Sequence, residues 1–333
     1  MSELRKHYFL DEYCVIAAER GSRPSDFISA PEISGIKDCA FCGGNEDKTP
    51  PATAVYRDGQ VLKDDDDGER VKDWQIRCIP NLYPALSPDA APIEASSARP
   101  QEGWQVQPGY GFHEVIVETP RHDKILPELT DDEMGLLMHV YRDRVVYYRS
   151  QEGIAYVSLF KNSGKSAGAS LEHTHSQLIA LPVQPSILQQ ELDVITHLEE
   201  CPYCSIARTE CESPRLVTRN LDWVAFTPFS SRFPFEVWLM PFKHIPDLVV
   251  CTDDVLVSLG IILREVMRGY RQLLGDMSYN YMFFQGPGPY HLNLRIQPVL
   301  TTVAGFEKNT GIFINTMAPE QAAADLRNIS GIK

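Results

Sequence analysis

The stretch His113-Glu-Val-Ile-Val-Glu-Thr-Pro-Arg-His122 recurs later in the chain as Phe235-Glu-Val-Trp-Leu-Met-Pro-Phe-Lys-His244. In each segment an apolar, strand-like run ends in a basic residue followed by histidine. Both segments lead into Thr-Asp-Asp and a stretch with helical spacing, at residues 130–150 and 252–274. A threonine suits a helix N-cap, and acidic side chains suit the first turn. The pair predicts one strand-to-helix unit that occurs twice.

The repeat extends to both sides of these segments. A Cys-x2-Cys pair precedes each one, at residues 39–42 and 201–204, and a second histidine-bearing strand follows, at residues 173–177 and 291–295. Accidental matches would not keep four elements in the same order. The sequence therefore predicts a duplicated α+β unit.

The composition fits a folded chain of two domains. The 333 residues are 43% hydrophobic, and at roughly 100–200 residues per domain they suffice for two domains, which we place at residues 1–190 and 191–333. No apolar stretch approaches the ~20 residues of a membrane span, and no secretory signal is visible. We therefore expect a cytoplasmic protein with no membrane partner. The formal net charge of -14 argues against binding to nucleic acid.

The spacing of cysteine and histidine predicts two metal sites. A Cys-x2-Cys turn holds two thiolates close enough to share one ion, and two imidazoles at strand ends complete a tetrahedral Cys2His2 zinc site. Such a closed site leaves no position for a substrate, so we expect two structural zinc ions per chain. The alternative is two coincidental pairs of buried thiols with unrelated histidines. The predicted ligands are Cys39, Cys42, His122 and His173 in the first copy, and Cys201, Cys204, His244 and His291 in the second.

The two copies differ at one residue that can perform chemistry. His173 has a counterpart in His291, whereas His175 is matched by Asn293. Residues two apart in a strand share a face, so His175 would lie beside a metal ligand with its imidazole available as a nucleophile, a base or a ligand. The alternative is that His175 is a structural histidine, with its hydrogen bonds made inside the fold and no chemical role. The preceding loop, residues 162–170, contains glycines, hydroxyls and a lysine, a composition that lets backbone N–H groups approach phosphate oxygens.

Together these residues resemble the active-site signature of the galactose-1-phosphate uridylyltransferase family, a branch of the histidine-triad superfamily with two such folds in one chain. The matching segments are Asn162-Ser-Gly164, Gly168-Ala-Ser170 and His173-x-His175-x-Gln177. Further similarities cover nearly the whole chain, at Arg20, Arg23, Asn81–Leu86, Arg121–Leu129 and Ala304–Glu307. The resemblance implies a duplicated histidine-triad-like fold, with two antiparallel sheets and packed helices.

The resemblance also implies a double displacement between a nucleoside-diphosphate sugar and a hexose 1-phosphate. His175 would attack the α-phosphorus, and the nucleotidyl-histidine would pass the nucleotide to a second acceptor. A backbone carbonyl near His173 would hold the His175 ring in the attacking tautomer. Gln177 and Ser170 are the other catalytic candidates. The substrate-binding candidates are Arg20, Arg23, Asn81, Asn162, Gly168, Glu307 and Asn315. In this family the enzyme is a homodimer, and the hexose-binding segment reaches the partner's active site.

Departures from the family pattern keep other functions open. Thr174 replaces the usual proline between the two histidines, and Thr301 or Thr302 replaces a lysine. The two Cys2His2 sets, with Ala304–Glu307 and Thr310–Asn315, are similar to the ADP-glucose phosphorylase branch, which uses inorganic phosphate as the acceptor.

The predicted function is therefore a hexose-1-phosphate nucleotidylyltransferase of the UDP-glucose type, with ADP-glucose phosphorylase as the alternative. A third possibility is a non-enzymatic paired-zinc module that binds nucleic acid or protein. The acidic charge and the difference between His175 and Asn293 count against that module.

Overall fold

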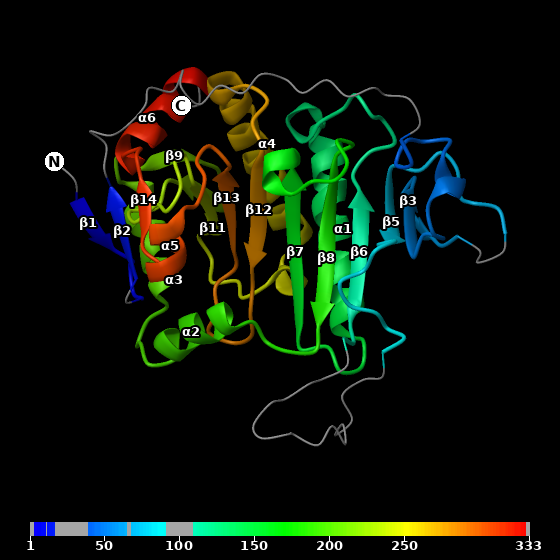
Figure 1. Cartoon of the computed structure of the whole chain (residues 1–333), viewed down its shortest axis with the longest axis horizontal. Coiled ribbons are helices and arrows are strands. Elements are labelled where there is room, and N and C mark those ends of the chain that lie inside the picture. The colour runs from blue at the N-terminus through cyan, green and yellow to red at the C-terminus, as the bar shows by residue number, and fades with distance from the viewer. Residues whose placement is uncertain (1–2, 11, 17–38, 65–67, 91–108, 331–333) are drawn as a thin grey trace.

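An 11-stranded antiparallel sheet forms the centre of the molecule, and a three-stranded sheet, β1-β2-β14, lies at one end of it (Figure 1). The structure is a computed structural model, and it describes residues 3–10, 12–16, 39–64, 68–90 and 109–330. The mixed α+β class with a large antiparallel sheet is confirmed. Among the described residues, no helix is both long enough and apolar enough to span a bilayer.

The helices and strands follow a similar order along the two halves of the chain, here taken as residues up to 190 and from 191. The elements of the first half are β1 Glu3–Lys6, β2 Tyr13–Ile16, η3 Glu46–Lys48, β3 Ala54–Arg57, β4 Gln60–Leu62, β5 Ile76–Pro80, β6 Phe112–Val117, η4 Leu126–Glu128, α1 Asp131–Arg149, β7 Tyr156–Ser163, η5 Lys165–Ala167 and β8 His175–Leu181. Helix α2, Ser186–Ile195, crosses the junction. The elements of the second half are α3 Pro202–Cys211, β9 Leu216–Arg219, β10 Trp223–Phe226, β11 Val237–Pro241, η6 Leu248–Val250, α4 Asp253–Leu274, β12 Tyr279–Phe284, β13 Asn293–Pro298, α5 Gly305–Thr310, β14 Phe313–Asn315 and α6 Pro319–Ser330.

The strand order of the large sheet is symmetric about the pair β7 and β12. Outward from this pair the first half reads β7-β8-β6-β5-β3, and the second reads β12-β13-β11-β10-β9. The pairing of Phe160 with Gln177 in the first half matches the pairing of Met282 with Arg295 in the second. The residues from His175 to Ala180 of β8 therefore correspond to those from Asn293 to Pro298 of β13.

The structure differs from the expected two sheets, one for each half. Strand β7 pairs antiparallel with β12, from Tyr279 opposite Ser163 to Met282 opposite Phe160, and joins the halves into one sheet. An edge strand presents a row of unpaired N–H and C=O groups, and pairing the two inner edges satisfies both rows. The halves are therefore joined by backbone hydrogen bonds as well as by the packing of side chains.

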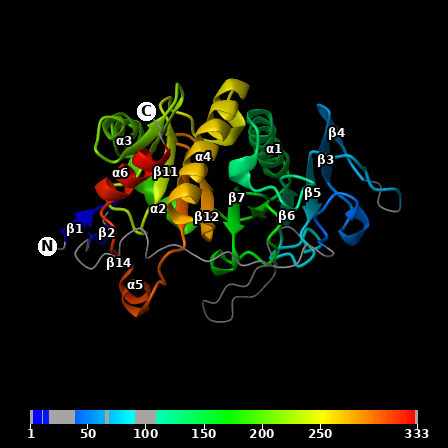
Figure 2. The same ribbon diagram turned by 90° about the horizontal axis from the view of Figure 1, so that it is seen from above.

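Helices α1 and α4 lie side by side on one face of the sheet (Figure 2). The predicted start of α1 is confirmed: Thr130 accepts from the Glu133 N–H at 3.2 Å, and the Glu133 carboxylate accepts from the Thr130 N–H at 2.7 Å. Where the helices meet, a Cβ on Gly260 would lie 3.0 Å from the Met134 carbonyl oxygen, so a larger residue would push them apart. Apolar side chains of the sheet and these helices form the main core.

The repeated glutamates of the opening segments lie on opposite faces of the sheet. Glu114 accepts from Arg144 of α1 at 2.8 Å, whereas Glu236 accepts from the Trp238 indole N–H at 2.9 Å on the face away from α4. A shift of one residue in strand register turns every side chain to the other face. The two glutamates are therefore matched in sequence only.

Candidate active site and metal centres

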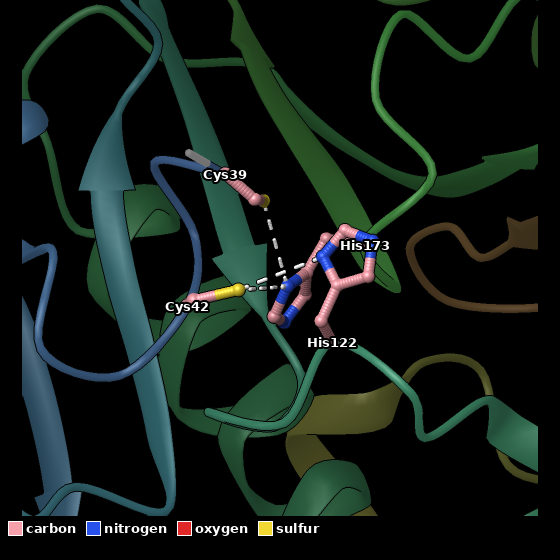
Figure 3. A group of neighbouring side chains, drawn as sticks. All are labelled: Cys39, Cys42, His122 and His173. Carbon is pink, nitrogen blue, oxygen red and sulfur yellow. Dashed lines mark hydrogen bonds between the residues drawn. The ribbon is translucent and has the colours of Figure 1, made fainter. Parts of the chain in front are cut away.

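The four predicted ligands of the first metal site converge (Figure 3). Their ligand atoms all lie within 4.8 Å of one another, and the Cys42 sulfur is 3.5 Å from His122 Nδ1 and 3.6 Å from His173 Nδ1. Bonds of ~2.3 Å to sulfur and ~2.0 Å to nitrogen in a tetrahedral zinc site give separations of about 3.5 Å. His173 Nε2 lies 2.7 Å from the Thr119 carbonyl oxygen, which orients the ring. This group fits a tetrahedral ion.

The second set has the same arrangement on different elements. Cys204 Sγ lies 3.5 Å from His244 Nδ1 and 3.4 Å from His291 Nδ1, and all four ligand atoms again lie within 4.8 Å. His291 Nε2 is 3.0 Å from the Pro241 carbonyl oxygen, as His173 is from that of Thr119. The thiols Cys201 and Cys204 lie at the start of α3, whereas those of the first site lie in a turn.

Both sites disfavour free thiolates. Burial, followed by the nearby Cys39, raises the pKa of Cys42 to about 11. Burial and the nearby Cys201 raise the pKa of Cys204 to about 11. A thiol must lose its proton to bind a metal, so a bound cation has to offset this cost. Two sulfurs and two imidazoles within reach of one point are a donor set typical of zinc.

His175 begins strand β8 and is almost completely buried. Its Nδ1 lies 2.7 Å from the His173 carbonyl oxygen, which can only accept, so Nδ1 carries the proton and Nε2 keeps its lone pair. Burial lowers the pKa of His175 below its usual range, so the ring is neutral near pH 7. This is the tautomer that the sequence analysis expected, and it is the one a nucleophilic Nε2 requires.

Gln177 and Asn81 meet at a residue that the sequence analysis did not select. His113 Nε2 lies 3.0 Å from Gln177 Oε1 and 3.1 Å from the amide nitrogen of Asn81. His113 Nδ1 also accepts from the Ala85 N–H at 3.1 Å. The available signal was alternation, because His113 and Val115 share the face of β6 on which Val115 pairs with Gln177. The predicted candidates Asn81 and Gln177 are thus close together.

The loop between β7 and β8 brings further candidates toward His175. Residues paired across a ladder project to one face, and Phe160 pairs with Gln177. Two residues further along their strands, Asn162 and His175 therefore project to this same face. Gly168 has a left-handed backbone with φ of 88°, and a Cβ there would lie 3.7 Å from the Asn162 amide nitrogen. Ser170 is exposed in the same loop.

Of the remaining candidates, Glu307 and Asn315 are not brought to His175 within this chain. Arg20 and Arg23 lie outside the described residues. Glu307 is on α5, where its carboxylate accepts from the Ala304 N–H at 3.1 Å, and α5 lies apart from β7 and β8 (Figures 1 and 2). Asn315 is buried at the end of β14, and its side chain bonds to backbone groups of Ser231, Phe233 and Met317.

A buried polar layer that the sequence analysis did not identify lies on the opposite face of the His175 strand. Lys161 Nζ donates to Glu118 Oε2 at 2.7 Å, to Thr174 Oγ1 at 2.8 Å and to the His175 carbonyl oxygen at 3.0 Å. Ser176 and Tyr141 donate to the other oxygen of Glu118. Although burial opposes it, the Lys161 ammonium lowers the pKa of Glu118, so the carboxylate is charged. The layer ties the backbone of His175 to β6 and β7.

Comparisons with known proteins show which family the chain resembles in sequence and fold. A sequence model described as "Galactose-1-phosphate uridyl transferase, N-terminal domain" matches residues 69–185. An ADP-glucose phosphorylase of Arabidopsis thaliana is 33% identical over 98% of this chain and 93% of its own, and a galactose-1-phosphate uridylyltransferase of Thermotoga maritima is 26% identical over 98% of each chain. The crystal structure of an Arabidopsis thaliana ADP-glucose phosphorylase with bound ADP-glucose superposes with a TM-score of 0.81, at 30% identity over 99% of each chain.

The fold and the relatives define an enzyme of the nucleotidyltransferase class. The chain belongs to the galactose-1-phosphate uridylyltransferase family. Family membership confirms the resemblance drawn from the sequence. Because the relatives are enzymes, the alternative of a non-enzymatic zinc module is wrong.

Proposed function

We propose that this protein is a hexose-1-phosphate nucleotidylyltransferase that works by double displacement through His175. The observation that carries the proposal is the hydrogen bond of 2.7 Å between His175 Nδ1 and the His173 carbonyl oxygen, which leaves the Nε2 lone pair free to attack. A covalent intermediate divides one difficult transfer into two easier steps.

In the first step, His175 Nε2 forms a bond to the α-phosphorus of a nucleoside-diphosphate sugar. The bond between that phosphorus and the bridging oxygen breaks, and a hexose 1-phosphate leaves with the electron pair. In the second step, a phosphate oxygen of the acceptor attacks the same phosphorus, and the electron pair of the P–N bond returns to Nε2. The histidine is thereby restored without any net gain or loss of a proton by the ring.

The neighbouring candidates would stabilise the phosphoryl oxygens. Gln177 and Asn162 supply uncharged donors on the face of His175, and Ser170 supplies a hydroxyl in the preceding loop. The backbone N–H groups around Gly168 can approach an oxygen closely. We assign Arg20 and Arg23 to the diphosphate and Asn81 to the nucleoside, in line with the family resemblance.

We further propose that each Cys2His2 group holds a structural zinc ion. Cys39, Cys42, His122 and His173 would hold one ion, and Cys201, Cys204, His244 and His291 the other. Bound zinc would cross-link loops by its four bonds, and a closed site has no position for a substrate. The first ion would fix His173, whose carbonyl orients His175.

A homodimer is also part of the proposal. Glu307, the expected hexose-binding residue, lies on α5 and apart from the His175 strand of its own chain (Figure 1). A second copy could supply this segment. We propose domains at residues 1–190 and 191–333 with histidine-triad-like folds, a cytoplasmic location, and no nucleic-acid partner, the last supported by the net charge of -14.

Two substrate pairs fit this chemistry. One is UDP-glucose with a hexose 1-phosphate such as galactose 1-phosphate, and the other is ADP-glucose with inorganic phosphate. The identity of 33% to an ADP-glucose phosphorylase, against 26% to the Thermotoga maritima uridylyltransferase, favours the second pair.

One experiment tests the function and separates the pairs. The protein is incubated with UDP-glucose or ADP-glucose, and intact mass spectrometry detects a uridylyl or adenylyl adduct. We expect an adduct on the wild-type protein and none on His175→Ala. Absence of an adduct with both sugar nucleotides, or equal labelling of the variant, would contradict the proposal.

A further inference from the structure

Asn162, on the strand that leads to the active-site loop, is held by a residue of the other half. Asn162 lies on β7, and Asn280 of β12 is the residue paired with it across the two strands. The Asn280 Nδ2 group donates to Asn162 Oδ1 at 2.8 Å and to the Ala167 carbonyl oxygen at 2.9 Å. One amide group thus contacts both the strand before the loop and the turn within it.

These bonds fix which end of the Asn162 amide points away from Asn280. The Ala167 carbonyl can only accept a hydrogen bond, so the group that faces it must be the NH2 of Asn280. The same NH2 faces Asn162, which must therefore present its oxygen. Asn162 Nδ2 is consequently turned toward Gly168 and the loop, where it can donate.

The loop is fitted closely to the second half at this point. Gly164 has φ of 82°, and a Cβ there would lie only 3.0 Å from the Ser278 Cα atom, so a side chain would displace the loop. Asn280 also lines a cleft of about 390 Å³ together with Ser166, Ala167 and Gln297. The loop before His175 thus rests on strand β12 and the residues around it.

No equivalent pair occurs at the symmetric position. Because Phe160 corresponds to Met282 in the strand registers, Asn162 corresponds to Phe284 and Asn280 to Ser158. A phenylalanine and a serine cannot form this amide contact. The contact is therefore specific to the side of the sheet that carries His175.

We propose that Asn280, supplied by the half without a nucleophile, is a positioning residue that makes Asn162 present an N–H donor to the transferring phosphoryl group. The inference rests on the function proposed above. A rotated Asn162 would present its oxygen to phosphoryl oxygens and repel them. The second half would then contribute to the chemistry through β12.

Asn280→Asp tests the inference because it keeps the shape and replaces the donor by a carboxylate. An acceptor there favours the rotated Asn162 amide. We expect the rate of nucleotidyl-enzyme formation at saturating sugar nucleotide to fall about 100-fold, as for loss of one oxyanion donor, with KM within about threefold. Asn280→Ala, which removes the donor without adding charge, should lower this rate about tenfold. Asn328→Asp, at an exposed position of α6, controls for added charge and should change neither quantity.

A double-mutant cycle distinguishes positioning from direct contact with a ligand in the cleft. If Asn280 acts through Asn162, Asn280→Asp should cause no further loss in an Asn162→Ala background. Losses that multiply would overturn the inference, as would rates within threefold of wild type for both Asn280 variants. If the wild-type protein forms no adduct, the proposed function fails instead, so the two failures are distinguishable.

Discussion

The two halves of the sheet carry the same hydrogen bond at corresponding positions, with different side chains. In the first half, His175 Nδ1 is 2.7 Å from the carbonyl oxygen of the residue two positions earlier. In the second half, Asn293 Nδ2 donates at 3.0 Å to the carbonyl of His291. Asparagine reproduces the contact but offers no nucleophilic nitrogen. The halves thus share a framework, whereas the groups suited to chemistry belong to one of them.

The neighbouring position extends this contrast. Gln177 lies on the His175 face, but its counterpart Arg295 is buried and donates to Glu191 at 2.9 Å. The Arg295 guanidinium also lies over the Phe284 ring, 3.7 Å from its centroid. Against the effect of burial, Arg295 lowers the pKa of Glu191, so this pair is charged. An internal ion pair thus occupies the face of β13 that corresponds to the His175 face of β8.

On the side of the sheet that faces the helices, the polar residues belong to the first half and the apolar residues to the second. Lys161, Thr174 and Ser176 form the polar layer under His175, and their counterparts are Phe283, Leu292 and Leu294, all buried. An apolar layer is therefore compatible with this strand geometry. The polar layer of the first half is additional to what the fold requires, and it holds the backbone of His175.

The largest expected difference between the halves is in the nucleophile. His175→Ala should reduce nucleotidyl transfer by roughly 10⁴-fold or more, because loss of a covalent catalyst leaves only binding and donor effects. Stopped-flow or quenched assays of hexose 1-phosphate release measure this loss. The matched Asn293→Ala variant removes a side chain that bonds to the His291 carbonyl and to Arg295 but carries no nucleophile. A comparable loss there would show that the halves are not chemically distinct.

Metal removal should affect both halves, with different consequences. Cys42→Ser and Cys204→Ser should each lower the zinc content from about two to about one per chain, and each should cost about 4 kcal/mol or more of unfolding free energy. Only Cys42→Ser should also slow nucleotidyl transfer strongly, because His173 orients His175. Metal analysis, urea unfolding and adduct formation test this, and equal slowing by both variants would contradict it.

The buried ion pairs should be sensitive to loss of one partner. Lys161→Met should destabilise the protein by about 3–5 kcal/mol, because it leaves the Glu118 carboxylate buried and unpaired. The double variant Lys161→Met/Glu118→Gln should recover part of this loss, since Phe283 shows that an apolar residue fits the corresponding place. Urea unfolding measures both. If the double variant recovered none of the lost unfolding free energy, the first half would require the charged pair.

The same pair predicts a dependence of stability on pH. The lowered pKa of Glu118 means that its stabilising contribution is present above the ordinary carboxyl value of 4.5 and is lost as pH falls through the lowered folded value. Unfolding free energies measured from pH 6 downward should therefore decline less steeply in Glu118→Gln than in wild type. An identical decline would mean that Glu118 does not contribute.

The smallest predicted difference concerns the helix starts. Thr130→Ala should cost about 1 kcal/mol, because it removes the hydroxyl that accepts from Glu133. Thr252→Ala should cost less, because Thr252 precedes α4 without a side-chain capping bond. Urea unfolding of the two variants checks this, and equal losses would contradict the difference in capping.

Much of the site could be predicted because its residues lie in recognisable local patterns. The Cys-x2-Cys pairs and their histidines were assigned correctly to two groups, since the repeat gave each group a second copy for comparison. The difference between His175 and Asn293 was visible for the same reason. His113 and Lys161 were not selected, because a single histidine or lysine within a strand has no distinguishing local pattern.

The sequence by itself therefore determined the composition of the two Cys2His2 groups, the capped start of α1 and the candidate nucleophile, all of which follow from short spacings and their repetition. Only the tertiary structure decided that β7 and β12 join the halves into one sheet and that Asn280 reaches Asn162. It also decided that Glu114 and Glu236 face opposite sides. These features depend on strand register and on pairing between residues more than a hundred positions apart, and local periodicity specifies neither.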